Sequence, residues 1–507
     1  MYVFLLQRQF TQVWVPRFIA CSWHVHGGLT QARGEAVILY RTLSLMPQYR
    51  LTLALLAAAP LLAQSPFVEK PYLQLGNTPG AESLTLLWHA PDRDAAWNVE
   101  VRTSKDSKWR AVNAPSAQSV RAPGIDAHRV YRAQLSKLVA GEEFQYQVLK
   151  DGKAVFEATG RARKSANQAQ HFVVMGDVAQ NTPGQKAVAH QVSLAKPDFV
   201  FITGDIVYSS GRISEYREKF FPIYNADADS AEVGAPLLRS VPFIAAPGNH
   251  DTIPRNFERF PDALAYFLYW DQPLNGPPGS HTLIGNVDAQ PAFLEAAKPR
   301  YPGMANFSFD YGNAHWTVLD SNTYMDWTNP ALRAWLEADL AEASKATFRF
   351  VAFHHPGFNS SKTHLADQWM RLLSPVFEKN KVDIVFAGHV HNYQRSYPLT
   401  FVPMPQADGA VKGPKGEVAG EWKLDKQFGD GGGKAKAHGV IYLVTGAGGA
   451  NLYNPEQTAR KETWQEFTQV YQAQVNSFTS VEINGKKLKI RQVSADGKEL
   501  DAFQLDK

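Results

Sequence analysis

Five short apolar runs in this chain each end in residues that can bind a metal ion. They lie between residues 171 and 391 and read HFVVMGD, PDFVFITGD, VPFIAAPGNHD, FRFVAFHHP and VDIVFAGHVH. Each has the length of a buried strand, and helix-like stretches separate them, which predicts α/β layers. Ligands of such sheets bind beyond the carboxyl ends of the strands. Five strand ends that all carry Asp, Asn or His therefore predict one shared polar site.

The polar residues at these ends form a set of metal ligands without a thiolate. The candidates are Asp177, Asp205, Asn249, His354, His389 and His391. Carboxylate, amide and imidazole ligands suit Fe, Mn and Zn. Six ligands exceed what one four-coordinate ion needs, so we expect two ions that share a bridging carboxylate. Two such cations can activate water and neutralise a phosphoryl group under attack, which predicts hydrolysis of a phosphate ester.

Other chemistries lack their characteristic residues. The sequence has no Gly-rich phosphate loop followed by Lys-Ser or Lys-Thr, and no Gly-x-Ser-x-Gly elbow. Its single cysteine, Cys21, lies near the N-terminus. Residues 1–64 hold five arginines and one glutamate, which leaves 47 basic and 47 acidic side chains in the remainder. This balance gives no reason to expect a nucleic acid or a membrane surface as a partner.

Residues 46–64 have the pattern of a signal peptide. A short positive region ending at Arg50 precedes 13 nearly all-apolar residues, Leu51–Ala63. A buried helix or a membrane span is the alternative, but the run is short for a span and Pro60 interrupts it. We therefore expect cleavage near Ala63 and a secreted or periplasmic mature chain without a membrane span. Residues 1–45 are interpreted as an upstream extension without function.

Residues 66–167 read as short strands between turns. About seven strands in some 100 residues predict a β-sandwich, and Asp151-Gly152 predicts a hairpin turn. The segment carries no candidate ligand cluster. A spacer, a carbohydrate-binding module and a lid are all compatible with it, and a packing and spacing domain is the interpretation that requires least.

The blocks GDVAQ, GDIVY, GNHD, VAFH and GHVH, in that order, resemble the five metal-binding blocks of the metallophosphoesterase superfamily. The tyrosine in GDIVY narrows the resemblance to the purple acid phosphatase family. The resemblance implies an all-β fibronectin-type sandwich at 66–167 and an α/β, four-layer αββα calcineurin-like catalytic domain at 170–450. Residues 451–507 are then expected to pack on the catalytic domain.

The resemblance also implies a role for individual residues. A ferric ion would be held by Asp177, Asp205, Tyr208 and His391, and a divalent Fe, Zn or Mn ion by Asp205, Asn249, His354 and His389. His250 and His364 would contact the phosphate or protonate the leaving group. The chain departs from the family pattern at Ala179, Thr363 and Gln394, of which Thr363 puts acid catalysis in doubt.

The expected activity is that of a secreted acid phosphatase that hydrolyses small phosphate monoesters by attack of metal-bound hydroxide. A phosphodiesterase or nucleotidase on the same dimetal scaffold is the first alternative. A non-catalytic secreted binding protein is the second, but it would require lost ligands. The histidines that fit no block, namely His171, His190, His281, His315 and His438, are interpreted as structural or exposed. Residues 404–438 are rich in Gly and Lys and connect GHVH to YLVTGAGG, so they could cover the site, but they are interpreted as a solvated loop. The sequence predicts no oligomeric state.

Overall fold

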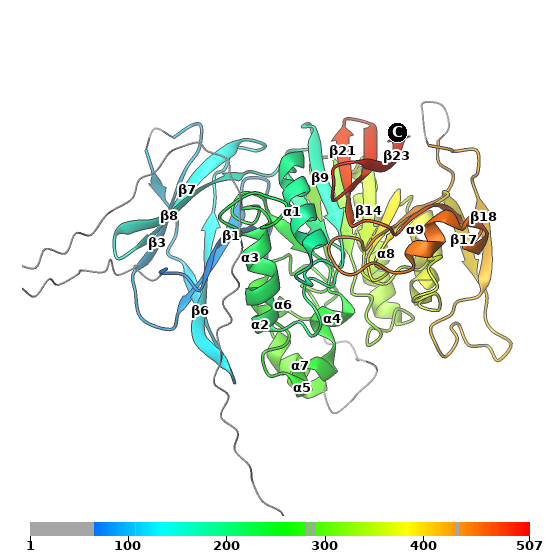
Figure 1. The fold of residues 1–507 in the computed structure, drawn as a ribbon, viewed down its shortest axis with the longest axis horizontal. Coiled ribbons are helices and arrows are strands. Elements are labelled where there is room, and N and C mark those ends of the chain that lie inside the picture. The colour runs from blue at the N-terminus through cyan, green and yellow to red at the C-terminus, as the bar shows by residue number, and fades with distance from the viewer. Residues whose placement is uncertain (1–64, 107, 279–283, 285–289, 431–435) are drawn as a thin grey trace, which may run out of the picture. The chain divides into compact units, whose positions relative to one another are not determined.

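The structure, a computed structural model, describes residues 65–106, 108–278, 284, 290–430 and 436–507. An antiparallel β-sandwich comes first in this part of the chain, and two larger mixed sheets follow it (Figure 1). The predicted signal peptide at 46–64 and the extension at 1–45, with Cys21, lie outside the described residues. Within the described ranges no helix has the length and apolar character needed to cross a membrane.

The sandwich consists of two four-stranded sheets with the orders β1-β2-β6-β5 and β4-β3-β7-β8. Its strands are β1 Glu69–Gln74, β2 Leu84–Pro91, β3 Trp97–Arg102, β4 Arg110–Ala111, β5 Ser116–Ala122, β6 Ile125–Leu135, β7 Glu143–Lys150 and β8 Lys153–Arg161. Trp88 of one sheet packs against Trp97 of the other, with ring centroids 5.7 Å apart. A sandwich is thus present where one was predicted, and its fibronectin-like type stays a prediction.

Two facing mixed sheets form most of the remainder. One has six strands in the order β11-β10-β9-β21-β22-β23, and the other has seven in the order β12-β13-β14-β15-β19-β16-β20. The bounds of the first are β9 Gln170–Met175, β10 Phe199–Ile202, β11 Phe243–Ala245, β21 Ser477–Asn484, β22 Lys487–Ser494 and β23 Glu499–Asp506. Those of the second are β12 Phe307–Tyr311, β13 Ala314–Val318, β14 Phe348–Ala352, β15 Ile384–Ala387, β16 Tyr393–Ser396, β19 Ile441–Thr445 and β20 Thr468–Gln472.

The central strands are apolar throughout because both of their faces are buried. Phe172 of β9 points into the layer between the sheets, whereas its neighbour Val173 belongs to the outer hydrophobic cluster. In the inner layer Trp316 of β13 lies 5.2 Å from Phe172 and 4.8 Å from Phe350 of β14, measured between ring centroids. Alternate side chains therefore fill different layers, which explains why these strands lack the polar alternation of the sandwich.

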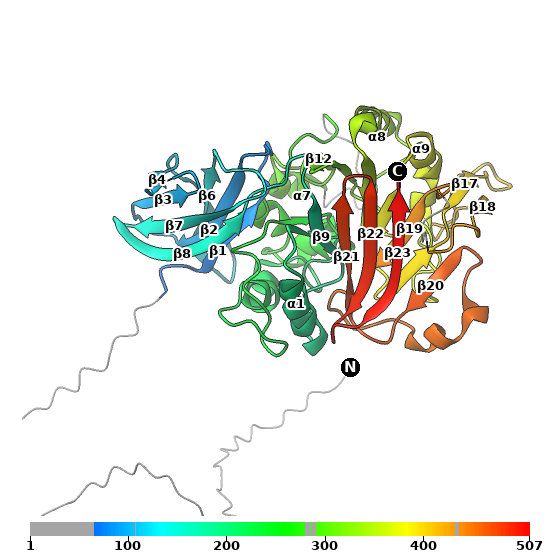
Figure 2. The same cartoon turned by 90° about the horizontal axis from the view of Figure 1, so that it is seen from above.

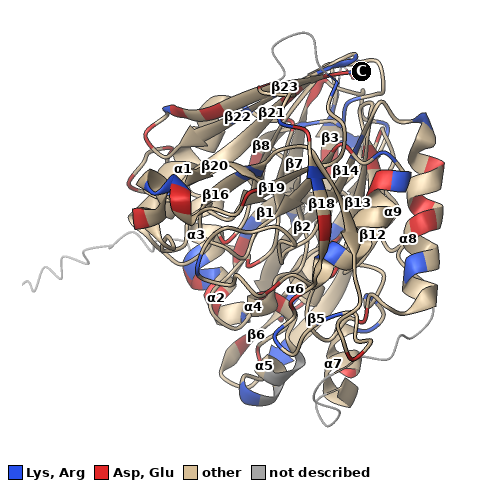
Figure 3. Cartoon of the chain, turned by 90° about the vertical axis from the view of Figure 1, so that its right-hand side faces the viewer, with Lys and Arg blue, Asp and Glu red and all other residues tan. Residues whose placement is uncertain are grey.

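Helices connect the strands and cover the outer faces. They are α1 Pro183–Ala195, α2 Ile213–Glu215, α3 Phe221–Tyr224, α4 Asn249–Thr252, α5 Pro254–Arg259, α6 Tyr266–Tyr269, α7 Gln290–Ala297, α8 Pro330–Glu342 and α9 Ser374–Lys379. The start of α1 follows from its sequence, because the Thr182 side chain accepts a hydrogen bond from the Gln185 N–H and Pro183 occupies the first turn. Basic and acidic residues are interspersed along α8 and α9 (Figure 3).

The C-terminal residues are integral to both sheets. Figure 2 shows β21, β22 and β23 beside β9, and the register pairs Val481 of β21 with Phe172 of β9. Strand β20 is an edge strand of the seven-stranded sheet. The expected packing of residues 451–507 on the preceding α/β layers therefore takes the form of shared sheets.

The interpretation of residues 404–438 as a solvated loop is wrong for part of that segment. Strand β18, Gly420–Leu424, pairs antiparallel with β17, Leu399–Pro403, and the two form a small separate sheet. The sequence missed this hairpin because Gly and Lys dominate the segment around a strand of only five residues. Residues 431–435 lie outside the described ranges.

Candidate metal centre

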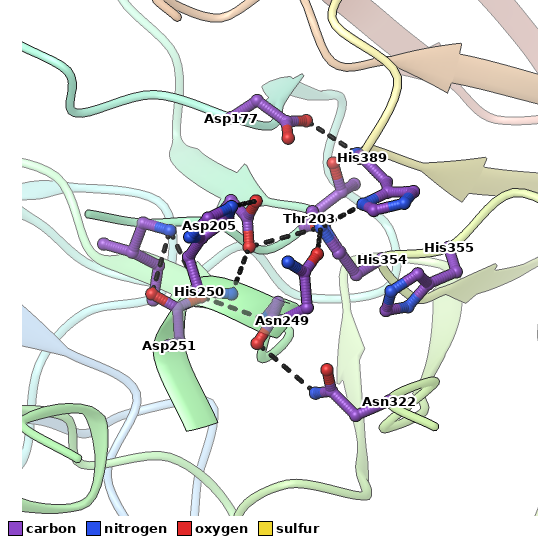
Figure 4. Close-up of polar contacts among 12 residues, drawn as sticks. Asp177, Thr203, Asp205, Asn249, His250, Asp251, Asn322, His354, His355 and His389 are labelled. Atoms are coloured by element: carbon purple, nitrogen blue, oxygen red, sulfur yellow. Dashed lines mark hydrogen bonds and ion pairs between the residues drawn. The ribbon is translucent and has the colours of Figure 1, made fainter. Parts of the chain in front are cut away.

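The loops that follow β9, β10, β11, β14 and β15 carry the predicted ligands, and the structure brings these loops together. Strands β9, β10 and β11 are parallel, as are β14 and β15, so the carboxyl ends meet along one edge of each sheet. The two edges are joined directly. The backbone N–H of His389 donates to Asp177 Oδ2 at 2.8 Å, and His354 Nδ1 lies 2.9 Å from the carbonyl oxygen of Thr203 (Figure 4).

A first group of ligand atoms gathers around Tyr208. Its hydroxyl lies 2.9 Å from Asp177 Oδ1 and 2.8 Å from His391 Nε2. Asp177 Oδ1 and His391 Nε2 are themselves 3.4 Å apart. All three residues are buried. A carboxylate, a phenol and an imidazole thus point their donor atoms at one place, as the family resemblance implied.

A second group gathers around His354 Nε2. This nitrogen lies 3.0 Å from Asn249 Oδ1 and 3.2 Å from Asp205 Oδ1 (Figure 4). His389 Nδ1 is 3.2 Å from the same nitrogen. The four residues therefore offer two oxygens and two nitrogens to a common point.

The spacing within both groups fits cations. Neighbouring ligands bonded at 2.0–2.2 Å to one tetrahedral or octahedral ion lie about 2.8–3.6 Å from each other. The separations given above range from 2.8 to 3.4 Å. Donor atoms of Asp177, Asp205 and His354 also lie within 4.8 Å of one another, so the two groups adjoin. This donor set fits two cations with one shared carboxylate.

Each ligand histidine has its other ring nitrogen fixed by an acceptor. His354 Nδ1 faces the carbonyl of Thr203, and His391 Nδ1 lies 2.7 Å from the carbonyl oxygen of Asn451. In His389 the roles are reversed, since Nε2 lies 3.1 Å from Asp367 Oδ2 and leaves Nδ1 to face the group. Such partners select the tautomer that presents a lone pair to the metal.

Close packing excludes side chains at the glycines that precede the predicted ligands. A Cβ on Gly204 would lie 2.6 Å from His354 Nδ1, and one on Gly388 would lie 2.7 Å from Asp177 Oδ2. A Cβ on Gly248 would overlap the backbone and carboxylate of Asp205. The ligand loops therefore pack so closely that the blocks GD, GN and GH cannot carry a side chain before the ligand.

Burial and neighbouring charges shift the pKa values of the site residues in different directions. Burial raises the pKa of Tyr208, and the carboxylates of Asp177 and Asp205 raise it further. Burial would lower the pKa of His354, but Asp205 outweighs it and the pKa rises to about 9. His389 is dominated by burial, which lowers its pKa to about 4. A cation bound here would compete with protonation of His354, as metal binding to such sites generally does.

The two predicted catalytic histidines flank the ligand groups and are about one third exposed. His250 Nδ1 lies 2.6 Å from the carbonyl oxygen of Ser209, and its Nε2 is 3.8 Å from Asp205 Oδ2. His364 Nδ1 lies 2.9 Å from Asp367 Oδ2. Each ring therefore keeps Nε2 available for a substrate. His355 is buried and bonds Ser321 through Nδ1 at 2.9 Å, and it lines a cavity together with His364 and His389.

Sequence reasoning missed three residues of the site. Asp367 joins His364 and His389, and only its spacing of three from His364 could have indicated it. Asp251 accepts backbone N–H groups of Ile206 and Gly248, so it ties the second block to the third. Tyr453 stacks on the His391 ring with centroids 3.9 Å apart. No pattern around Tyr453 marks it as part of the site.

The departures from the family pattern have structural roles. Gln394 is buried, donates to Asn359 Oδ1 at 2.8 Å and accepts from the Ser360 N–H at 2.8 Å. Thr363 donates to Asn454 Oδ1 at 3.0 Å. Ala179 is buried in the outer hydrophobic cluster.

Most of the histidines outside the blocks are confirmed as structural or exposed. His171 bonds Ser480, His190 pairs with Asp229, His315 lies between two aspartates, and His438 is largely exposed beside Asp425. His281 lies outside the described residues.

Comparison with known proteins agrees with this geometry. Residues 170–393 match the family model of the calcineurin-like phosphoesterases. The chain contains a calcineurin-like phosphoesterase domain. This domain includes all seven expected metal ligands, from Asp177 to His391, and both expected catalytic histidines. The clustering of its Asp and His side chains fits the dinuclear metal centre of metallophosphoesterases.

The similar proteins include purple acid phosphatases, as the sequence predicted. Purple acid phosphatase 18 of Arabidopsis thaliana is 23% identical over 323 residues, which cover 62% of this chain and 64% of the relative. An uncharacterized protein of Mycobacterium tuberculosis is 24% identical over 363 residues, 65% of this chain and 62% of the relative. Probable inactive purple acid phosphatase 24 of Arabidopsis thaliana is 26% identical over 308 residues, 56% of this chain and 42% of the relative. The chain thus spans less than two thirds of each relative's length.

The fold has a solved counterpart. The structure of purple acid phosphatase PPD1 from yellow lupin (Lupinus luteus) seeds superimposes with a TM-score of 0.61 at 19% identity, covering 86% of this chain and 74% of that one. At this identity the likeness concerns the fold alone.

Proposed function

We propose that this protein is an exported dimetal acid phosphatase that hydrolyses phosphate monoesters. The observation that carries the proposal is the pair of donor groups, around Tyr208 and around His354, that meet at Asp205. Two bound cations would supply Lewis acidity and activate the attacking water. The pattern of residues 46–64 supports export.

Ligand chemistry supports an unequal pair of cations. The first group combines a phenol with carboxylate and imidazole, a set suited to a ferric ion, because a trivalent charge favours the phenolate of Tyr208 despite its burial. The second group has an amide oxygen and two imidazoles, and suits divalent Fe, Zn or Mn. Burial and the neighbouring carboxylates raise the pKa of Tyr208, and a highly charged cation at this position would favour its phenolate.

The histidines of the rim complete the proposal. His250 and His364 each have Nδ1 held by a protein acceptor, so their Nε2 atoms are available to bind phosphate oxygens or to deliver a proton to the leaving oxygen. Asp367 would hold His364 in the orientation that this role needs. A purely binding role is disfavoured because none of the expected ligands has been replaced.

The test is substitution of the shared carboxylate. Asp205→Asn should lower the kcat for a chromogenic aryl phosphate by more than about 100-fold, since the ligand common to both cations loses its charge. Asp126→Asn, at an exposed position in the sandwich, is the matched control and should leave kcat unchanged. Full activity of Asp205→Asn would refute the dimetal mechanism.

A further inference from the structure

The tip of the β17–β18 hairpin lines the cavity that contains the metal-site residues. This cavity has a volume of about 400 Å³. Its lining includes Asn249, His364 and His389 on one side, and residues 412–416 of the hairpin on the other. Ligand pockets generally have volumes of about 300–1,000 Å³, so the space suits a molecule larger than a phosphate ion. The hairpin is therefore placed to touch the part of a substrate that the metal ligands do not.

The tip is held in place by the segment that follows Asp367. Gln368 donates its backbone N–H to the Gly416 carbonyl at 3.2 Å, and its side-chain oxygen accepts the Val418 N–H at 3.1 Å. Arg371 donates to the Val418 carbonyl at 3.3 Å. Within the tip, the Gly413 N–H donates to the Glu417 carbonyl at 2.7 Å. These bonds fix the hairpin to the same stretch of chain that orients His364.

Gly416 allows this close approach. Its φ of +96° lies in the region that glycine tolerates best, and a Cβ at this position would lie 2.6 Å from the Trp369 ring. Trp369 in turn donates to the Ser321 carbonyl at 2.9 Å, beneath the cavity. The tip thus rests on a ring that is itself anchored to the site.

The charges of the cavity wall are arranged for an anion. Lys412 and Lys415 line the cavity, are exposed, and form no ion pair with any residue in the described ranges. Asp367 is the single carboxylate among the described lining residues, and it already accepts hydrogen bonds from His364 and His389. The nearby Glu417 carboxylate accepts the backbone N–H of Lys415 at 3.0 Å. Two lysines therefore line the cavity without an ion-pair partner among the described residues.

We propose that Lys412 and Lys415 bind a second anionic group on the substrate, so that the preferred substrates are phosphate monoesters whose leaving group carries a carboxylate or another phosphate. The inference rests on the proposed function, because it places the scissile phosphate at the metal ligands. An ammonium group attracts either anion as a point charge, so the shared feature is the negative charge at the far end of the leaving group.

Binding of non-hydrolysable analogues tests the inference without requiring turnover. The dissociation constants of phenylphosphonate, 3-carboxyphenylphosphonate and 4-carboxyphenylphosphonate are measured by calorimetry on the metal-loaded full chain. At least one carboxylated analogue should bind roughly three- to tenfold more tightly than phenylphosphonate, as expected for a partly exposed ion pair. The preference should decrease as salt concentration rises.

Substitution of the two lysines tests whether they cause the preference for carboxylated analogues. Lys412→Gln/Lys415→Gln should bind the carboxylated analogues no more tightly than phenylphosphonate, while its affinity for phenylphosphonate stays unchanged. Lys423→Gln, on β18 of the same hairpin and outside the cavity lining, is the matched control and should keep the wild-type preference. Gly416→Ala retains both lysines but displaces the tip from Trp369, and should also reduce the preference.

Two results would overturn the inference. One is equal affinity of the wild type for all three phosphonates, and the other is a preference that survives in Lys412→Gln/Lys415→Gln. Hydrolysis of the corresponding phosphate esters is measured separately. Loss of the proposed function would appear as absence of turnover of every ester, whereas failure of this inference would appear as turnover without discrimination.

Discussion

At the residue scale, several of the predicted ligands adopt a backbone conformation that their residue types rarely use. Asp177, Asp205 and His389 have φ values of +58°, +49° and +67°. Left-handed backbone at a residue other than glycine is uncommon and is found most often where surrounding contacts enforce it. Here the enforcing contacts are the close loop packing and the hydrogen bonds to Asp177 and Asp205. The sequence predicted which residues lie at the site, but not the backbone conformation that aims their side chains.

His315 provides a pH-dependent contribution to stability outside the site. Its Nδ1 lies 2.8 Å from Asp310 Oδ1 and its Nε2 lies 3.2 Å from Asp339 Oδ2. Burial would lower its pKa, but the two carboxylates outweigh burial and raise the pKa to about 9. A histidine whose pKa is raised on folding stabilises fully below its unfolded value of about 6.5, and this stabilisation is lost as pH rises through 9.

We therefore predict that the free energy of unfolding contributed by His315 falls by about 2–3 kcal/mol between pH 6.5 and pH 9. Denaturant unfolding across this range should show a smaller fall in the free energy of unfolding in His315→Gln than in the wild type, because the contribution of His315 is lost. His438→Gln replaces a largely exposed histidine and should keep the wild-type slope. An unchanged slope in His315→Gln would contradict the prediction.

The limits of sequence reasoning are visible in single residues. Asp205 and His391 could be predicted because each follows an apolar run with a glycine. Asp367 could not, because it acts on two histidines through a loop that has no repeating pattern. The roles of Tyr393 and Arg395 could not be predicted either. Both donate to Asp501 of the last strand at 2.7 Å, and this contact is visible only in the folded structure.

At the scale of elements, the site depends on how tightly the loops after the strands pack. Gly248 immediately precedes α4 and packs closely against Asp205. A Cβ at this position would overlap the Asp205 carboxylate. We predict that Gly248→Ala displaces Asn249 or Asp205, lowers kcat by about 100-fold and reduces the bound metal. The check is a metal determination together with kcat.

The control for this change is Gly80→Ala, at a turn where the nearest heavy atom to a new Cβ is the Ser83 hydroxyl at 3.1 Å. That variant should keep its metal and its activity. If Gly248→Ala also kept both, the close packing of the two loops would not be needed for the site.

Strands were predicted more reliably than the hairpin. The runs that form β9, β10, β14 and β15 have apolar side chains on both faces, and this pattern can be recognised from the sequence without knowledge of tertiary structure. The hairpin β17–β18 has no such signal, because its partly exposed strands are stabilised by contacts with the segment around Arg371. Its closeness to the cavity is a tertiary property.

At the scale of the whole molecule, the order of sandwich, α/β layers and C-terminal segment was predictable from the change of pattern along the chain. The pairing of β21 with β9 was not, because the partners are about 300 residues apart in sequence. Arg395 helps to hold the C-terminal strands in place, since it is buried and binds Asp501 of β23 and the exposed Asp430. The site and the C-terminal strands are therefore parts of one sheet system.

Metal analysis of the purified full chain, combined with its visible spectrum, tests the central claim most directly. The structure and ligand chemistry predict two metal ions per chain, of which at least one is iron. They also predict a visible absorption band that disappears in Tyr208→Phe, because the Tyr208 hydroxyl lies 2.9 Å from Asp177 Oδ1 and 2.8 Å from His391 Nε2. A colourless, iron-free protein with full phosphatase activity, or an active protein with a single metal ion, would contradict the account.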